Sequence, residues 1–181
     1  MRAITARYKI PLLVSLVCAL ALIALGGITY WLSAILVFLG AIIGFIILDL
    51  EYIVHAYLVD PLSETSLLIK SYIRAKNAGE YARFLSENEY TLGEVSIRSV
   101  LFQVGLFLFT IYVVTTSANA FVQGAALSMY ANLLYYQFVE FKKTQTLQRW
   151  FWIYTGNLNV GVYKIYIGLI FLSLVFVLAM I

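Results

Sequence analysis

Apolar residues in this chain fall in long runs, separated by short segments that hold glycine, polar and charged residues. Several runs approach or exceed about 18 residues, which lets a helix cross a hydrocarbon core about 30 Å thick. No segment alternates apolar and polar residues over about ten positions, as the strands of a transmembrane β-barrel do. The pattern therefore predicts an all-α protein, a polytopic transmembrane helical bundle.

We expect about five spans and one short amphipathic, cytoplasmic helical insertion between spans two and three, all within a single membrane domain, residues 1–181. The spans cover about 10–25, 31–50, 100–114, 120–139 and 162–181, and the insertion covers about 60–92. Gly26-Gly27 and the polar run 115–119 predict the two tight connections. Whether the fifth span crosses the whole membrane stays open.

The polar segment 60–92 carries apolar residues at helical spacing, so it predicts short amphipathic helices. Asp60-Pro61 predicts the first helix start, with Asp60 as the N-cap and proline at the first helical position. Asn77-Ala78-Gly79 predicts the end of that helix, and a second short helix follows it. The pair either lies on the membrane surface or packs beneath the bundle, which is the simpler arrangement.

The start of the third span carries a capping-box pattern, Thr91-Leu92-Gly93-Glu94, which predicts that a helix begins there and continues into the membrane. Glu94 and Arg98 are four residues apart on this helix. They are therefore expected to pair on its exposed first turn.

Basic residues predict the orientation of the bundle. Lysine and arginine occur in three segments that are expected on one side of the membrane, namely 2–9, 60–92 and 142–149. The connections around Gly27 and Thr116, expected on the other side, hold neither residue. By the positive-inside rule the basic side is cytoplasmic. The N-terminus is then cytoplasmic, and the C-terminus lies on the opposite side if five spans cross.

Composition narrows the class further. Hydrophobic residues make up 63% and charged residues 12% of the chain, and the formal net charge is +3. We interpret the basic residues as topology signals that contact the lipid bilayer, and we expect no nucleic-acid partner. Cys18 is the single cysteine, so no intrachain disulfide or cysteine-based metal cluster can form. No cofactor motif is found, and none is expected.

The end of the second span gathers the ionisable residues that most suggest chemistry. Four residues share one face of the helix within an arc of about 60°, namely Gly40, Gly44, Glu51 and His55. Asp49 points nearly the opposite way. Glu51 and His55 could share a proton or bind one metal ion, although a metal site would need a third ligand.

The fourth span repeats small and polar residues every four positions, at Ala120, Gly124, Ser128, Asn132, Tyr136 and Glu140. This stripe predicts interhelical packing and hydrogen bonds. Glu140 ends it on the cytoplasmic side, where it could approach Glu51 and His55. Gln103 and Gln137 lie at a similar depth.

Two functions fit these residues, and a third fits less well. The first is an accessory or scaffold subunit of a membrane complex or homo-oligomer, joined through the Gly40/Gly44 and Gly124/Ser128 faces. The alternative is a membrane-embedded enzyme or carrier for a lipid-like substrate. It would use Glu51, His55 and Glu140 as weak catalytic candidates, with basic residues 142–149 near the headgroup. An ion channel lacks a continuous polar path.

At the membrane boundary, however, charged side chains are inexpensive, so Glu51 and His55 also have a purely structural interpretation. We therefore assign no metal ligand, and Glu51 and His55 are only weak candidates for a metal site.

Overall fold

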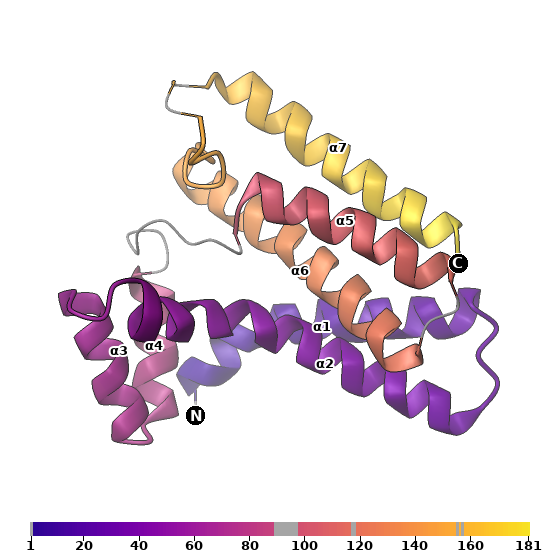
Figure 1. The fold of residues 1–181 in the computed structure, drawn as a ribbon, viewed down its shortest axis with the longest axis horizontal. Coiled ribbons are helices and arrows are strands. Elements are labelled where there is room, and N and C mark those ends of the chain that lie inside the picture. Colours follow the sequence, from indigo (N-terminus) through magenta and orange to yellow (C-terminus); the bar gives the residue numbers. More distant parts are fainter. Residues whose placement is uncertain (1, 89–97, 117–118, 155, 157) are drawn as a thin grey trace.

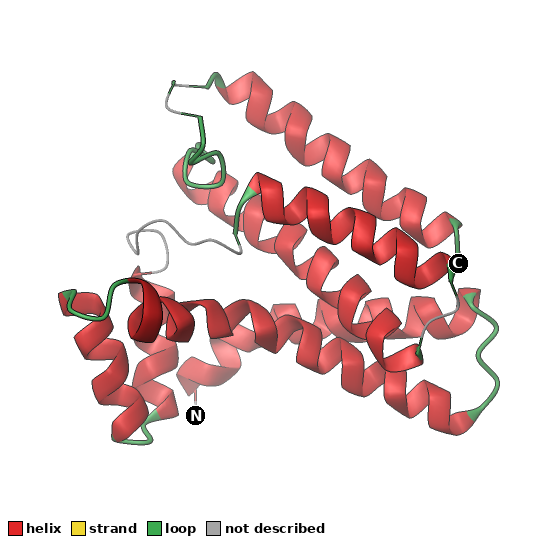
Figure 2. Cartoon of the chain, viewed as in Figure 1, coloured by secondary structure: helices red, strands yellow, loops and turns green. Residues whose placement is uncertain are grey.

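The computed structural model describes residues 2–88, 98–116, 119–154, 156 and 158–181, and within them it contains helices and loops but no strand (Figure 2). In chain order the elements are α1 (Arg2–Leu25), α2 (Trp31–Val54), the π-helix η1 (His55–Val59), α3 (Glu64–Arg74), α4 (Ala78–Asn88), α5 (Val100–Thr115), α6 (Ala120–Thr144) and α7 (Val160–Ala179). The predicted all-helical class is confirmed for these residues.

Three helical segments are long and apolar enough to cross a membrane: Arg7–Leu25, Trp31–Val59 and Val160–Ala179. Helix α5 is apolar but has 16 residues, which gives a length of about 24 Å, short of a hydrocarbon core of about 30 Å. Helix α6 has 25 residues, but it carries more polar side chains. The structure thus gives three candidate spans and a shorter apolar helix, and it does not confirm the count of five.

The long helices α1, α2, α5, α6 and α7 run along one general direction (Figure 1). The N-terminus, the α3–α4 pair and the α6–α7 connection lie at one end, on the left of the view. The α1–α2 connection and the C-terminus lie at the other end. We call the left end the basic end, because residues 7–9, 70–83 and 142–149 all lie there.

Helices α2 and α6 make the most extensive contact of the bundle, and glycine permits it. A Cβ atom placed on Gly40 or Gly44 would overlap the backbone of α6, and one placed on Gly124 would overlap the backbone of α2 at Val37. The expected glycine faces therefore pack against each other within the chain. Gly40, Gly44, Gly124 and Ser128 are buried there.

The middle of α6 is held by hydrogen bonds between polar side chains. Ser128 Oγ donates to the Ala41 carbonyl at 2.7 Å and lies 2.9 Å from Ser15 Oγ, and Asn132 Nδ2 donates to Ser15 Oγ at 2.9 Å. All three side chains are buried. Polar residues of membrane helices face other helices in this way, so the polarity of α6 fits its position inside the bundle.

The α3–α4 pair packs onto the end of α2 and does not stand apart from it. Tyr52 of α2, Ala56 of η1, Ile69 of α3 and Leu85 of α4 form a small core of their own. Packing beneath the bundle is thus the arrangement that the structure adopts. The break between the two helices falls at Asn77, as expected, and Asn77 Oδ1 accepts a hydrogen bond from the Glu80 amide.

The start of α3 differs from the expectation that Asp60 is its N-cap. Ser63 has extended backbone angles and its Oγ accepts from the Ser66 amide, so Ser63 is the N-cap. The amide of Asp60 instead donates to the His55 carbonyl and closes the π-helix. The helix formed by α2 and η1 continues to Val59. The turn that follows it therefore contains Asp60 and Pro61.

Helix α5 begins at Val100 with Ser99 as its N-cap, and Ser99 Oγ accepts from the Phe102 amide at 3.2 Å. The Val100 amide donates to the Trp150 carbonyl, which ties this helix start to the α6–α7 connection. The expected capping box at 91–94 and the Glu94 side of the Glu94–Arg98 pair lie outside the described residues.

Candidate functional site

A cluster of four charged side chains lies at the basic end of the bundle. Arg7 comes from α1, Asp49 and Glu51 come from the last turns of α2, and Arg98 precedes α5. Glu51 is 4% exposed and Arg98 is 1% exposed. We call this group, with the rings of Tyr52 and Tyr136, the Arg98 cluster.

Ion pairs connect the four charged side chains of the cluster in series. Arg7 Nη2 lies 3.2 Å from Asp49 Oδ1, and Arg98 Nη2 lies 3.6 Å from the same oxygen. Arg98 Nε lies 3.8 Å from Glu51 Oε2, and the Arg98 amide donates to Glu51 Oε1 at 3.3 Å. Two cations thus balance two anions. A buried charge without such a partner would carry a large desolvation cost.

Two tyrosine rings cover the Arg98 guanidinium. Its Cζ lies 4.3 Å from the ring centroid of Tyr136 and 5.1 Å from that of Tyr52. Both distances allow a cation–π interaction. Tyr136 belongs to α6 and Tyr52 to α2, so Arg98 joins three parts of the chain: the segment before α5 and these two helices.

Asp49 was expected to point away from Glu51, yet both carboxylates are buried and both pair with Arg98. The helical projection of α2 is itself correct. Instead, α2 is covered on more than one side at this depth, because α1 brings Arg7 to the Asp49 side while α6 covers another face. The long arginine side chain then reaches both carboxylates.

Glu140 lies in a second buried ion pair. Arg149 Nη2 donates to its Oε2 at 2.6 Å, and Trp150 Nε1 donates to the same atom at 3.0 Å. Trp150 is 1% exposed. This pair closes the turn between α6 and the loop that follows it. The structure thus places Glu140 with Arg149 and Trp150, and it places Glu51 with Arg98.

His55 begins the π-helix η1 and is half-buried. The His55 amide still donates to the Glu51 carbonyl, as in an α-helix, so the expected four-residue spacing of the two residues is kept at the end of α2. No group of three or more histidine, cysteine, aspartate or glutamate side chains placed to hold a metal ion occurs among the residues that the structure describes.

Tyr81 of α4 borders the Arg98 cluster from the α3–α4 layer. Burial raises the pKa of its phenol above the ordinary value of 10.0, and the negative charge of Asp49 acts in the same direction. Its hydroxyl is buried and has no hydrogen-bond partner among the described side and main chains. The phenol is therefore neutral at physiological pH.

Sequence reasoning located the two acidic residues of the cluster but missed Arg7 and Arg98 as their partners. Arg7 was interpreted as a topology signal, and Arg98 was expected on an exposed helix turn. One signal could have found them: both arginines stand at the ends of spans that were expected on the same side of the membrane as Asp49 and Glu51.

The arrangement can hold helices together, and its charges are balanced within the chain. No protein-family model, curated protein or solved structure matches this chain. The chain is identified by its architecture alone, a helical bundle whose apolar helices indicate a membrane protein.

Proposed function

We propose that this chain is a multi-pass membrane protein that acts by packing, as an accessory or scaffold subunit of a membrane complex or homo-oligomer. One observation carries the proposal. The buried charged residues of the described chain, Asp49, Glu51, Arg98 and Glu140, each take part in an ion pair within the protein. These groups thus stabilise a rigid body, which is what a scaffold requires.

The distribution of basic residues supports an orientation for this body. Under the proposal the basic end faces the cytoplasm, so the N-terminus and the α3–α4 pair are cytoplasmic and the C-terminus is on the far side. The α3–α4 pair is the part of the chain best suited to meet a soluble partner, because it leaves the apolar helices and carries charged side chains such as Lys76 and Arg83.

The alternative function, an enzyme or carrier for an amphiphilic substrate that uses Glu51, His55 and Glu140, gains less support. Arg98 engages Glu51, and Arg149 engages Glu140. A general acid or base has to reach the proton that it transfers, within hydrogen-bond distance or through one water. Both carboxylates are already committed to arginines, so this function would require the ion pairs to open.

The native mass of the full chain tests the scaffold proposal. The chain, extracted in mild detergent and measured by native mass spectrometry, is expected as a defined assembly heavier than its own 20.4 kDa. Glu140→Gln serves as the matched variant, because it removes the charge of the alternative catalytic candidate but leaves the outer surface unchanged. The variant should keep the mass of the assembly. A wild-type chain found only as a monomer, over a range of mild detergents, would contradict the proposal.

A further inference from the structure

An apolar groove runs between α1, α6 and α7, and its volume is about 770 Å³. Cavities that bind small molecules have volumes of about 300–1,000 Å³. Six of its lining residues mark the three walls: Leu13, Val17, Ala131, Phe138, Gly168 and Phe171. Leu13, Val17, Phe138 and Phe171 are each more than half exposed, so the groove opens sideways from the bundle.

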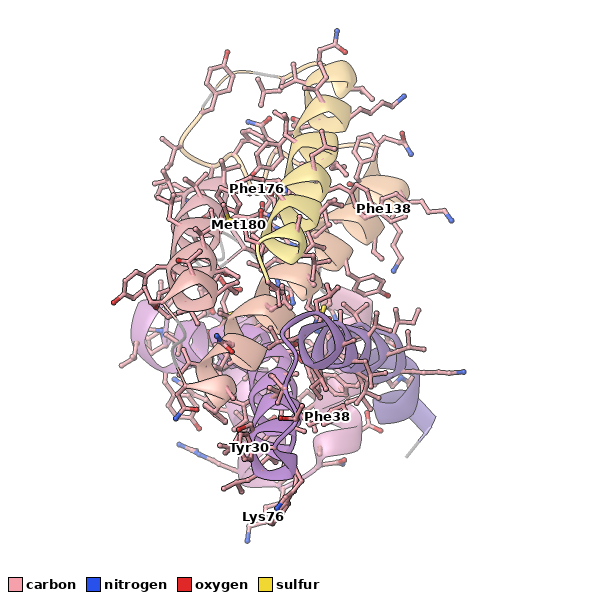
Figure 3. All side chains as sticks on the ribbon, turned by 90° about the vertical axis from the view of Figure 1, so that its right-hand side faces the viewer. Tyr30, Phe38, Lys76, Phe138, Phe176 and Met180 are labelled. Carbon is pink, nitrogen blue, oxygen red and sulfur yellow. The ribbon has the colours of Figure 1, made fainter. Side chains whose placement is uncertain are left out.

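The open side faces where membrane lipid would lie. Figure 3 shows Phe138 on α6 projecting outward on the side of the bundle away from α5. Gly168 lies in the α7 wall, and a Cβ atom placed on it would meet no atom within 4 Å. The groove is therefore not filled by the chain's own side chains at this point.

One end of the groove is basic. Lys164, in the first turns of α7, is the charged member of the lining, and it is exposed. Lys9 is also exposed and lies four residues before Leu13, so it extends from the same face of α1. In Figure 1, however, α1 starts at the lower left and α7 at the upper left, so Lys164, which lines the groove, supplies the positive charge at this end.

The length of the apolar part fits a hydrocarbon chain. From Lys164 to Leu178, both of which line the groove, α7 rises about 21 Å. A lipid acyl chain is extended, apolar and narrow, whereas a second helix with its side chains is about 10–12 Å wide. A helix would also cover Lys164, at the desolvation cost of a buried cation.

We propose that this groove binds an anionic phospholipid, with an acyl chain along α1, α6 and α7 and the headgroup phosphate at Lys164. The lysine side chain can extend along the apolar wall and place its ammonium group at the headgroup level. The proposal does not depend on the scaffold function, because it concerns the isolated chain and one lipid.

Native mass spectrometry of the purified full chain tests this site with two probes that share acyl chains, dioleoyl phosphatidylglycerol and dioleoyl phosphatidylcholine. The wild type should retain the anionic lipid several-fold more than the zwitterionic one. Lys164→Ala should reduce that preference to near unity. Gly168→Leu should reduce retention of both lipids, because the new side chain occupies the groove.

Two controls separate the groove from general effects. Gly105→Leu adds the same side chain on α5, where a Cβ atom also meets nothing within 4 Å, and it should leave both lipids bound. Arg83→Ala removes an exposed cation far from the groove and should leave the lipid preference unchanged.

Equal retention of the two lipids by the wild type would overturn the proposal, as would unchanged retention in Gly168→Leu. A loss of self-association in Gly168→Leu with normal lipid retention would assign the groove to a protein helix and would also overturn it. A monomeric wild type that retains the anionic lipid would contradict only the scaffold function.

Discussion

Arg98 is the residue on which the charge balance of the basic end depends. It contacts both buried carboxylates, and its guanidinium lies beneath two tyrosine rings. Removal of one partner from a buried ion pair leaves an unpaired charge, which costs about 3–5 kcal/mol. We therefore expect Arg98→Met to lower the unfolding temperature of the purified protein markedly, as measured by tryptophan fluorescence in detergent.

A second substitution distinguishes charge balance from packing in that experiment. In Arg98→Met, one positive charge on Arg7 remains against two negative charges on Asp49 and Glu51. Adding Glu51→Gln restores one of each, so the double variant should recover part of the lost stability. Arg83→Met, which removes an exposed helix-surface pair, should change little. A double variant less stable than Arg98→Met would refute the charge-balance explanation.

Tyr81 makes the stability of the α3–α4 layer depend on pH in the alkaline range. Its pKa is raised in the folded state, so the stability that its neutral form contributes is fully present below the ordinary value of 10.0 and is lost as pH rises through the raised value. Tyr81→Phe removes an unpartnered buried hydroxyl. We expect it to be neutral or stabilising at pH 7 and to flatten the fall in unfolding temperature above pH 10.

The readout for Tyr81→Phe is the difference in unfolding temperature from wild type across pH 7 to about 11. Tyr154→Phe is a suitable control, because Tyr154 is exposed and its removal should leave the alkaline slope unchanged. A Tyr81→Phe protein with the same alkaline slope as wild type would show that this phenol stays accessible to water.

At the scale of elements, the α2–α6 contact depends on how closely the backbones of the two helices approach each other. In Gly44→Ala the new Cβ atom would overlap the Ala125 carbonyl, and an overpacked core costs about 1–3 kcal/mol. Gly105→Ala adds the same methyl group where nothing lies within 4 Å, so it should be neutral or stabilising through helix propensity. Thermal unfolding of the two variants should thus shift in opposite directions, and two equal shifts would contradict this packing.

Hydrophobic patterning predicted the helix bounds well, because an apolar run long enough to cross a membrane has few other ways to satisfy its backbone. The starts of α2 at Trp31 and α6 at Ala120 agree with the expected ones. Helix α5 starts at the expected span boundary, Val100, but Arg98 and Ser99 before it are not helical, so the expectation that one helix continues from residue 91 into the span was wrong. The start of α3 was wrong by three residues, because Ser63 and not Asp60 is its N-cap.

The four-residue stripe of α6 shows how far sequence periodicity extends to a site. It correctly placed polar residues on faces that meet other helices, as Ser128 and Asn132 do with Ser15. It could not identify which residues they meet, because the partners lie more than a hundred positions away in the chain. Pairing across such distances is decided by tertiary packing, and Arg98, which lies 47 positions from its partner Glu51, was missed for the same reason.

For the whole molecule, the number of crossings decides how α5 and α6 sit in the membrane. Three helical segments are clear candidate spans, α5 is short, and α6 is polar but enclosed by its neighbours. With the basic end placed inside by the positive-inside rule, a three-span and a five-span chain would both have the C-terminus outside. They differ at the connection between α5 and α6, which reaches the far side only if both helices cross.

Single cysteines in a Cys18→Ser background resolve this point with a membrane-impermeant maleimide. We expect Thr116→Cys, at the exposed end of α5, to react from outside intact cells, because five crossings explain why this connection carries no lysine or arginine. Ser86→Cys on α4 and Thr146→Cys after α6, both at exposed positions, should react only after permeabilisation. Protection of Thr116→Cys in intact cells, with labelling after permeabilisation, would mean that α5 and α6 enter the bilayer from the cytoplasmic side without crossing it. In that case the burial of Ser128 and Asn132 would be explained by the α1–α2–α6 contact alone, with no requirement for a fifth span.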